Sequence, residues 1–266
     1  MKATSYEHGV FCWVDLVAHD MEAAARWYSE LFGWDAQRSP ASEGRPPYVV
    51  FLARGQQVAG LGQMSDEMKA AGVPSMWNSY VNVDDAVATV ERARSLGASV
   101  TVEPFPVPGV AKLAFLTDPQ GAAFALWQAE GSIGAGLVNE PCSLSWNELA
   151  INDVRKARDF YSRLFGWSFS EQPMDGWTYT GIMVGARMNG GIMPILHEQP
   201  EGTPPAWLAY FAVEDVDKTT EAARASGATI FAEPFDTPGG RISVIRDPQG
   251  AFFTAITLPA DAKTDC

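Results

Sequence analysis

Histidine and cysteine, two of the side chains that most often bind transition metals, are scarce in this chain of 266 residues. There are three of each: His8, His19, His197, Cys12, Cys142 and Cys266. The cysteines are odd in number and show no C-x-x-C spacing, which argues against a disulfide framework and against a zinc knuckle. We therefore expect free thiols. No spacing pairs the histidines, so we expect these to be loop residues exposed to solvent.

Positive charge and long apolar runs are also lacking. The chain has 19 Lys and Arg against 32 Asp and Glu, a formal net charge of -13, and such a field repels nucleic acid and anionic membrane surfaces. No stretch approaches the roughly 18 consecutive apolar residues of a membrane span, and the N-terminus does not resemble a signal peptide. We therefore predict a soluble, cytoplasmic protein with neither nucleic acid nor membrane as a partner.

The two halves of the chain repeat one sequence pattern. The segment CWVDLVAHDMEAAARWYSELFGW at 12–34 recurs as SWNELAINDVRKARDFYSRLFGW at 145–167, and the turn TDPQGAAF recurs as RDPQGAFF. Self-similarity at a nearly fixed offset is typical of tandem units, and we expect each to fold as a separate domain. The predicted domains cover 8–128 and 141–258, and a glycine-rich linker over 129–140 joins them.

Within each half the pattern predicts two successive βαβββ units. A short strand precedes an amphipathic helix that Asp20 caps and Gly33 ends, and further strands follow. The third quarter repeats this design with Asp153 and Gly166. The prediction is an α+β fold of four βαβββ units. The aromatic residues on these helices and at their ends are expected in the core: Trp27, Phe32, Trp34, Phe160, Phe165 and Trp167.

The helix ending in Y-x-x-L-F-G-W and the final strand D-P-x-G-x-x-F resemble those of the vicinal-oxygen-chelate superfamily. This superfamily includes glyoxalase I, extradiol dioxygenases, and the fosfomycin- and bleomycin-resistance proteins. The duplicated W-V-D-L and W-N-E-L form is similar to an actinobacterial tandem group that includes the mycobacterial 27-kDa antigen. The resemblance covers nearly the whole chain. It implies two tandem glyoxalase-like domains, each with a sheet curled round a cavity.

In the metal-binding members of that superfamily, His, Gln or Glu side chains on the first and last strands of the units hold a divalent ion. By position, these ligand sites fall on six residues here: Trp13, Asn78, Ala125, Trp146, Leu208 and Thr254. None is His, Cys, Asp or Glu, the side chains that supply most of the lone pairs divalent ions require. The resemblance therefore implies that the usual metal site is absent, and we predict a protein without a metal or another cofactor.

Strand alternation predicts which side chains line the two cavities. The acids are Asp15 in the first half and Glu148 in the second. The other predicted ligand-binding residues are Trp13, Asn78, Tyr80, Trp127, Trp146, Tyr210 and Thr254. Aromatic walls with a few polar groups are typical of a small-molecule pocket, although the tryptophans can also be read as plugs in an emptied metal cavity. Because the polar positions differ between the halves, we expect unequal pockets.

The two acids leave several functional interpretations open. A carboxylate in such a cavity can accept a hydrogen bond from an aromatic or amphipathic metabolite, which describes a metal-independent binding protein. Asp15 or Glu148 can instead serve as the general base of a cofactor-free enzyme of isomerase, cyclase or lyase type. Each acid can also be structural and hold a neighbouring tyrosine. A metal-dependent lyase or dioxygenase with a displaced site is the remaining alternative. Fusion of two domains favours a monomer over a homodimer.

Overall fold

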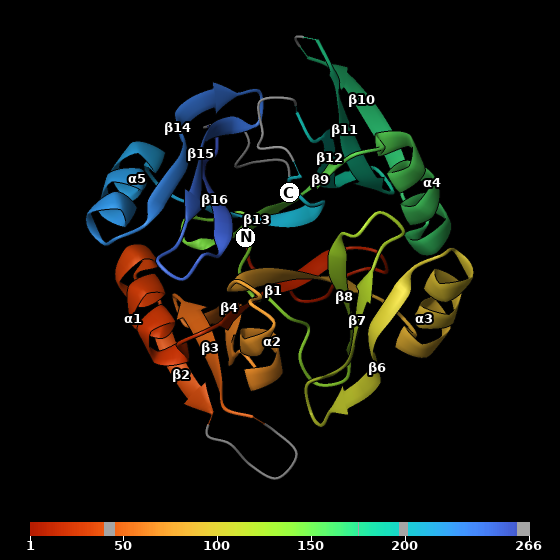
Figure 1. Ribbon diagram of the computed structural model, residues 1–266, viewed down its shortest axis with the longest axis horizontal. Coiled ribbons are helices and arrows are strands. Elements are labelled where there is room, and N and C mark those ends of the chain that lie inside the picture. Colours follow the sequence, from red (N-terminus) through yellow and green to blue (C-terminus); the bar gives the residue numbers. More distant parts are fainter. Residues whose placement is uncertain (40–45, 175, 197–201, 260–266) are drawn as a thin grey trace.

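The computed structural model describes residues 1–39, 46–174, 176–196 and 202–259, so His197 and Cys266 lie outside the described residues. The chain forms two eight-stranded sheets, and each sheet comes from one half of the sequence (Figure 1). Each half contains two βαβββ units, so the predicted α+β fold of four such units is confirmed. The domain boundaries at 128 and 141 stay a prediction.

The first sheet has the strand order β2-β3-β4-β1-β5-β8-β7-β6. Its strands are β1 (Phe11–Ala18), β2 (Asp35–Ser39), β3 (Tyr48–Ala53), β4 (Gln56–Gln63), β5 (Met76–Asn82), β6 (Ser99–Val107), β7 (Ala111–Thr117) and β8 (Ala123–Ala129). The central strands β1 and β5 run antiparallel, and each pairs on its other side with the parallel last strand of its own unit. The two units of one half therefore share one continuous sheet.

The second sheet repeats this order as β10-β11-β12-β9-β13-β16-β15-β14. Its strands are β9 (Ser143–Ile151), β10 (Ser168–Pro173), β11 (Thr178–Val184), β12 (Arg187–Pro194), β13 (Ala206–Ala212), β14 (Thr229–Thr237), β15 (Gly240–Arg246) and β16 (Phe252–Thr257). The central strands β9 and β13 again run antiparallel. The sequence repeat is thus a repeat of topology.

Five helices accompany the sheets in the described part of the chain: α1 (Met21–Phe32), α2 (Asp66–Ala70), α3 (Ala86–Ser95), α4 (Val154–Phe165) and α5 (Val216–Ala225). The predicted caps are confirmed, since the Asp20 carboxylate accepts from the Ala23 N–H and the Asp153 carboxylate from the Lys156 N–H. Gly33 and Gly166 end their helices in the left-handed conformation. No helix among the described residues is long and apolar enough to cross a membrane.

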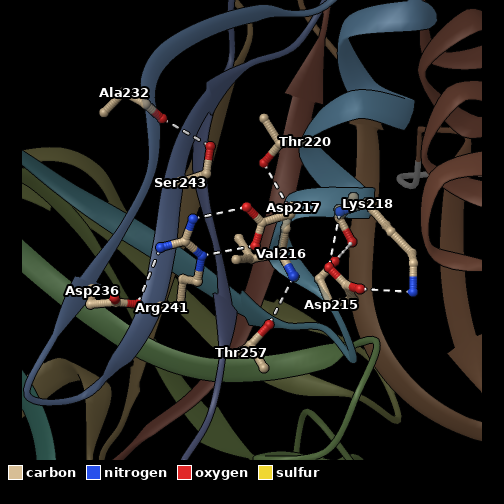
Figure 2. Close-up of polar contacts among 11 residues, drawn as sticks. Asp215, Val216, Asp217, Lys218, Thr220, Ala232, Asp236, Arg241, Ser243 and Thr257 are labelled. Atoms are coloured by element: carbon tan, nitrogen blue, oxygen red, sulfur yellow. Dashed lines mark hydrogen bonds and ion pairs between the residues drawn. The ribbon is translucent and has the colours of Figure 1, made fainter.

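Ion pairs on the outer surface tie α5 to the edge of the second sheet (Figure 2). The Arg241 guanidinium on β15 donates to both carboxylate oxygens of Asp217, each at 2.8 Å, and to Asp236 on β14 at 3.2 Å. Asp215 caps the helix through the Lys218 N–H and also pairs with the Lys218 ammonium at 2.8 Å. These groups are partly exposed, so they orient the helix more than they stabilise it.

The helix-side cores are shared between the halves. One cluster joins the first unit, including Leu16 and Tyr28, to the fourth unit, including Phe211 and Phe253. A second cluster joins the second unit to the third. Figure 1 shows the consequence, with α1 beside α5 and α3 beside α4. This differs from the expectation that each half buries its own core. Periodicity predicts which face of an element is apolar, but it does not predict which element covers that face.

The predicted core aromatics lie in these shared clusters. Five are buried: Phe32, Trp34, Phe160, Phe165 and Trp167. Trp27 is only half-buried, because its ring reaches the end of α5, where its indole N–H donates to the Ser226 carbonyl at 3.1 Å. Trp27, although only half-buried, therefore also contacts the other half of the chain.

Buried hydrogen bonds also cross between the halves. The Tyr28 hydroxyl on α1 donates to Asp247 Oδ2 at 2.9 Å, and it accepts from the Trp77 indole at 3.0 Å. The same arrangement recurs at the other junction with Tyr161, Asp118 and Trp207. Burial raises the pKa of both aspartates. In each half, a tyrosine on the first helix therefore donates a hydrogen bond to the aspartate of the D-P-Q-G turn in the other half.

The glutamine of each D-P-Q-G turn completes the junction. Gln249 accepts from the Asp20 N–H at 2.8 Å and donates to the Asp20 carbonyl at 2.9 Å. Gln120 holds Asp153 in the same way, with both distances 2.9 Å. Each turn thus binds the backbone at the start of a helix in the other half. The sequence predicts these turns only as chain corners, so their role in joining the halves is a tertiary effect.

Candidate functional site

The two faces of each sheet separate as strand alternation predicts. Val14 and Leu16 of β1 lie in the helix-side core, whereas Trp13 lies in a different cluster on the opposite face, which we call the inner face. Cys12 is buried and groups with Trp13, although strict alternation predicts that it lies on the opposite side. A β-bulge between Phe11 and Trp13 explains the difference, because a bulge brings two successive side chains to one side.

On the inner face of the first half, the Asp15 carboxylate accepts three hydrogen bonds. Asn78 Nδ2 donates to Oδ1 at 2.9 Å, and the hydroxyls of Tyr80 and Tyr48 donate to Oδ2 at 2.9 and 3.1 Å. The Trp13 indole N–H donates to the Tyr48 hydroxyl at 3.2 Å. The predicted residues Trp13, Asp15, Asn78 and Tyr80 therefore come together in one network, the first carboxylate cluster.

The second half repeats the network with one change. The hydroxyls of Tyr210 and Tyr179 donate to Glu148 at 2.5 and 2.9 Å, and the Trp146 indole donates to the Tyr179 hydroxyl at 3.1 Å. Leu208 is the cross-strand partner of Glu148, as Asn78 is of Asp15, so this second carboxylate cluster has no amide donor at that position. Among the described residues, Glu148 therefore accepts one side-chain hydrogen bond fewer than Asp15.

Sequence reasoning missed Tyr48 and Tyr179, the tyrosines that link each tryptophan to its acid. They come from β3 and β11, and they reach across β4 and β12 above Gly60 and Gly191. A Cβ at Gly60 would lie 1.9 Å from the Tyr48 hydroxyl oxygen, and one at Gly191 would lie 1.8 Å from that of Tyr179. The available signal was the repeat itself, which keeps both tyrosines and both glycines at one offset.

Burial governs the protonation of these clusters. Desolvation raises the pKa of Asp15 and of Glu148, and the surrounding donors offset only part of that effect. Desolvation and the neighbouring acid also raise the pKa of Tyr80 and of Tyr210. The tyrosines therefore stay protonated and act as donors, and each acid has a higher proton affinity than an exposed carboxylate.

The six positions implied as metal ligands do not supply a metal site. Their side chains are two indoles, an amide already bonded to Asp15, two hydrocarbons and one hydroxyl, on Trp13, Trp146, Asn78, Ala125, Leu208 and Thr254. Within the described ranges, no group of three or more His, Cys, Asp or Glu side chains could hold an ion. Because divalent ions prefer carboxylate, imidazole or thiolate ligands, these residues do not fit one.

Two further predicted site residues, Trp127 and Thr254, differ in how the protein holds them. Trp127 lies 6.0 Å from Trp13 and 5.9 Å from Tyr80 between ring centroids, and its indole N–H donates to the Ser132 carbonyl at 3.0 Å. Thr254 is the cross-strand partner of Tyr210. The Thr254 hydroxyl is buried and has no hydrogen-bond partner among the described residues.

Comparison with known proteins agrees with this architecture. The model of the Glyoxalase/Bleomycin resistance protein/Dioxygenase superfamily matches residues 11–126 and 143–254. The putative glyoxylase CFP32 of Mycobacterium tuberculosis is 38% identical, covering 96% of this chain and 97% of that protein. The anthracycline biosynthesis protein DnrV of Streptomyces peucetius is 32% identical, covering 96% of this chain and 95% of that protein.

Two solved structures share the fold at low sequence identity. The Mn(II)-bound glyoxalase from Novosphingobium aromaticivorans aligns with a TM-score of 0.63 and 17% identity, covering 93% of this chain and 82% of that one. The 2,3-dioxygenase LapB from Pseudomonas sp. KL28 aligns with a TM-score of 0.64 and 12% identity, covering 95% and 93%. The chain therefore belongs to the Glyoxalase/Bleomycin resistance protein/Dioxygenase superfamily, as two tandem glyoxalase-like domains.

Proposed function

We propose that this chain is a cytoplasmic, metal-independent binding protein for an aromatic or amphipathic small molecule, held on an inner face of its sheets. The observation that carries the proposal is the repeated carboxylate cluster. In both halves, a buried acid with tyrosine and tryptophan partners lies beside a tryptophan at a position that the family resemblance implies as a metal ligand. A hydrogen-bonded acid beside aromatic rings can recognise a polar group on a ring-rich ligand without a metal.

The relatives support a ring-rich ligand. DnrV and DauV are named as anthracycline biosynthesis proteins, and both align with this chain over 96% of its length. Anthracyclines are flat polycyclic aromatics, and stacking on tryptophan, tyrosine or phenylalanine suits that shape. Net charge of -13 favours a neutral or cationic ligand over an anionic one.

Elemental analysis together with native mass spectrometry tests the proposal. We expect no stoichiometric Zn, Ni, Mn or Fe in the purified protein, and a small organic adduct that survives treatment with a chelator. One tightly held, chelator-sensitive ion per domain would overturn the metal-independent reading. It would favour the metal-dependent lyase or dioxygenase with a displaced site, although the described residues contain no group of three or more His, Cys, Asp or Glu side chains that could hold an ion.

A cofactor-free enzyme of isomerase, cyclase or lyase type is the second candidate. The observation that favours it is that burial raises the pKa of Asp15 and of Glu148, and a general base works best with a pKa nearer the working pH. If either acid is the base, Asp15→Asn or Glu148→Gln should lower turnover of a true substrate by about 10²–10⁴-fold with little change in affinity. A loss of affinity without any turnover in the wild type would leave binding as the function.

A further inference from the structure

The inner face of the first half is filled by its own rings. Phe115 packs edge-on to Tyr80 with centroids 5.8 Å apart, and Phe105 stacks on Phe115 at 6.4 Å and 13°. Trp13 and Trp127 pack against each other and are only 3% and 5% exposed. The aromatic surface of this half is therefore already used in contacts within the protein.

Chain segments outside the sheet close the same face. The Tyr6 hydroxyl donates to the Ala135 carbonyl at 2.6 Å, and the Ala135 N–H donates to the Cys12 carbonyl at 2.8 Å. The Trp127 indole is bonded to Ser132 in the connection between the halves. Tyr6 and Ala135 also pack within the inner-face cluster of Trp13. These segments therefore cover part of the inner face of the first half, at Trp13 and Trp127.

The second half has smaller side chains at the corresponding places. Val244 stands where the repeat has Phe115, and Ile256 stands where it has Trp127. Both lie at the corresponding register position, because Val244 pairs with Thr254 as Phe115 pairs with Ala125, and Ile256 pairs with Ile242 as Trp127 pairs with Leu113. Trp146 is half-buried, whereas its counterpart Trp13 is buried. The volume that rings fill in the first half is thus not filled by the matching side chains in the second.

Aromatic rings of the second half are exposed instead. Phe235 is 45% exposed, and its cross-strand partner Ile242 belongs to the inner-face cluster, so Phe235 lies on the inner side. Its counterpart Phe105 is covered by stacking. Phe231, which is 50% exposed, stands edge-on to Phe252 at 5.4 Å. These rings offer apolar surface at the margin of the second sheet that no described side chain covers completely.

The second carboxylate cluster has room for one more donor. An ionised carboxylate can accept about four hydrogen bonds, and the side-chain donors to Glu148 in the described part of the chain are two tyrosine hydroxyls. In the first half, the Asn78 amide supplies a third donor to Asp15. Leu208 replaces that amide next to Glu148, so the protein provides no donor from this position. An incoming hydroxyl could take its place.

We propose that the inner face of the second half is the ligand site, and that it takes a flat polycyclic aromatic whose hydroxyl donates to Glu148 where Asn78 donates to Asp15. This assignment rests on the proposed binding function and narrows it to one half. The rings of Phe235 and Trp146 contact the aromatic body, and Leu208, Val244 and Ile256 provide the apolar floor. In the first half, the corresponding carboxylate cluster has a structural role and binds no ligand.

The test is calorimetric titration of the full chain with 1,4-dihydroxyanthraquinone, a flat ring system with phenolic hydroxyls. We expect one site per chain. Leu208→Asn restores the internal donor to Glu148 and should weaken binding about tenfold to hundredfold, the range for a lost hydrogen bond to a charged group. Phe235→Ala should weaken binding, and the matched variant Phe105→Ala in the first half should leave the affinity unchanged.

Thermal unfolding of each variant separates a loss of binding from a loss of folding. If Leu208→Asn does not fold, Val244→Phe supplies the second measure, because the phenylalanine of the first half then fills the site and should abolish binding. Two equal sites, or a loss of affinity in Phe105→Ala and not in Phe235→Ala, would overturn the assignment and leave the binding function intact. No binding to wild-type protein would overturn both.

Discussion

Substitution of Gly60, which lies under the Tyr48 ring, gives the sharpest test of the hydrogen bonds in the first carboxylate cluster. A Cβ at this position would lie 1.9 Å from the Tyr48 hydroxyl oxygen and 2.6 Å from the ring carbon that carries it. Both atoms are far inside van der Waals contact, so Gly60→Ala must displace the Tyr48 ring. Gly62 is the matched control on the same strand, because its nearest atom on Tyr48 is a ring carbon at 3.7 Å, an ordinary contact.

The expected cost follows from the bonds that Tyr48 makes. Displacing its hydroxyl removes the hydrogen bond to the Asp15 carboxylate, worth about 1.5–3 kcal/mol, and the one from Trp13, worth about 0.5–1.5 kcal/mol. Replacing glycine by alanine also raises the free energy of unfolding by about 0.4–1 kcal/mol, because alanine restricts the unfolded chain. Gly60→Ala should therefore lower the free energy of unfolding by about 1–4 kcal/mol, whereas Gly62→Ala should leave it unchanged or raise it slightly.

Urea unfolding measures the free energy of unfolding of both variants, provided that their m-values equal that of the wild type. Equal unfolding free energies for Gly60→Ala and Gly62→Ala would refute the reasoning, because they would show that the bond between Tyr48 and Asp15 contributes nothing. Gly191→Ala provides the repeat in the second half, since its Cβ would lie 1.8 Å from the Tyr179 hydroxyl oxygen.

Two other predictions concern proton uptake and the shared core. Burial raises the folded-state pKa of Glu148, so its contribution to stability is complete below the ordinary pKa of a glutamate and is lost as pH rises through the folded value. In thermal unfolding, Glu148→Gln should thus gain stability relative to wild type as pH rises above the ordinary pKa of a glutamate, and a trend in the other direction would refute this. Residues 1–134 alone should show no cooperative unfolding, because both helix-side cores lose their partners; a sharp transition would contradict the shared core.

Much of the local structure could be predicted from sequence patterns. Residues that recur at helical spacing gave the helices, and an aspartate at the start with a glycine at the end gave their limits, as at Asp20 and Gly33. Strand alternation predicts that Trp13 and Asp15 share one face of β1, and Val14 and Leu16 lie on the other face, in the helix-side core. These signals are readable because they depend on residues a few positions apart.

Only some of the site residues could be predicted from the sequence, for a similar reason. Asp15, Asn78 and Tyr80 lie on neighbouring central strands, and position alone brings them together. Tyr48 reaches the acid from β3 across Gly60, and such a contact depends on a ring orientation that strand alternation does not describe. Cys12 lies on the inner face, contrary to strand alternation, because a β-bulge interrupts the alternation there.

The sequence by itself therefore determined the repeat, the four units, the identity of the apolar faces, and the absence of His, Cys, Asp and Glu from the six positions that the family resemblance implies as metal ligands. Only the tertiary structure decided that the first unit packs on the fourth, that Gln249 and Gln120 hold the helices of the opposite half, and that rings cover the first inner face and leave the second less covered. The physical reason is that covering an apolar face stabilises the fold whichever element supplies the cover. The choice among possible covers is made by shape and hydrogen bonding between residues far apart in the chain.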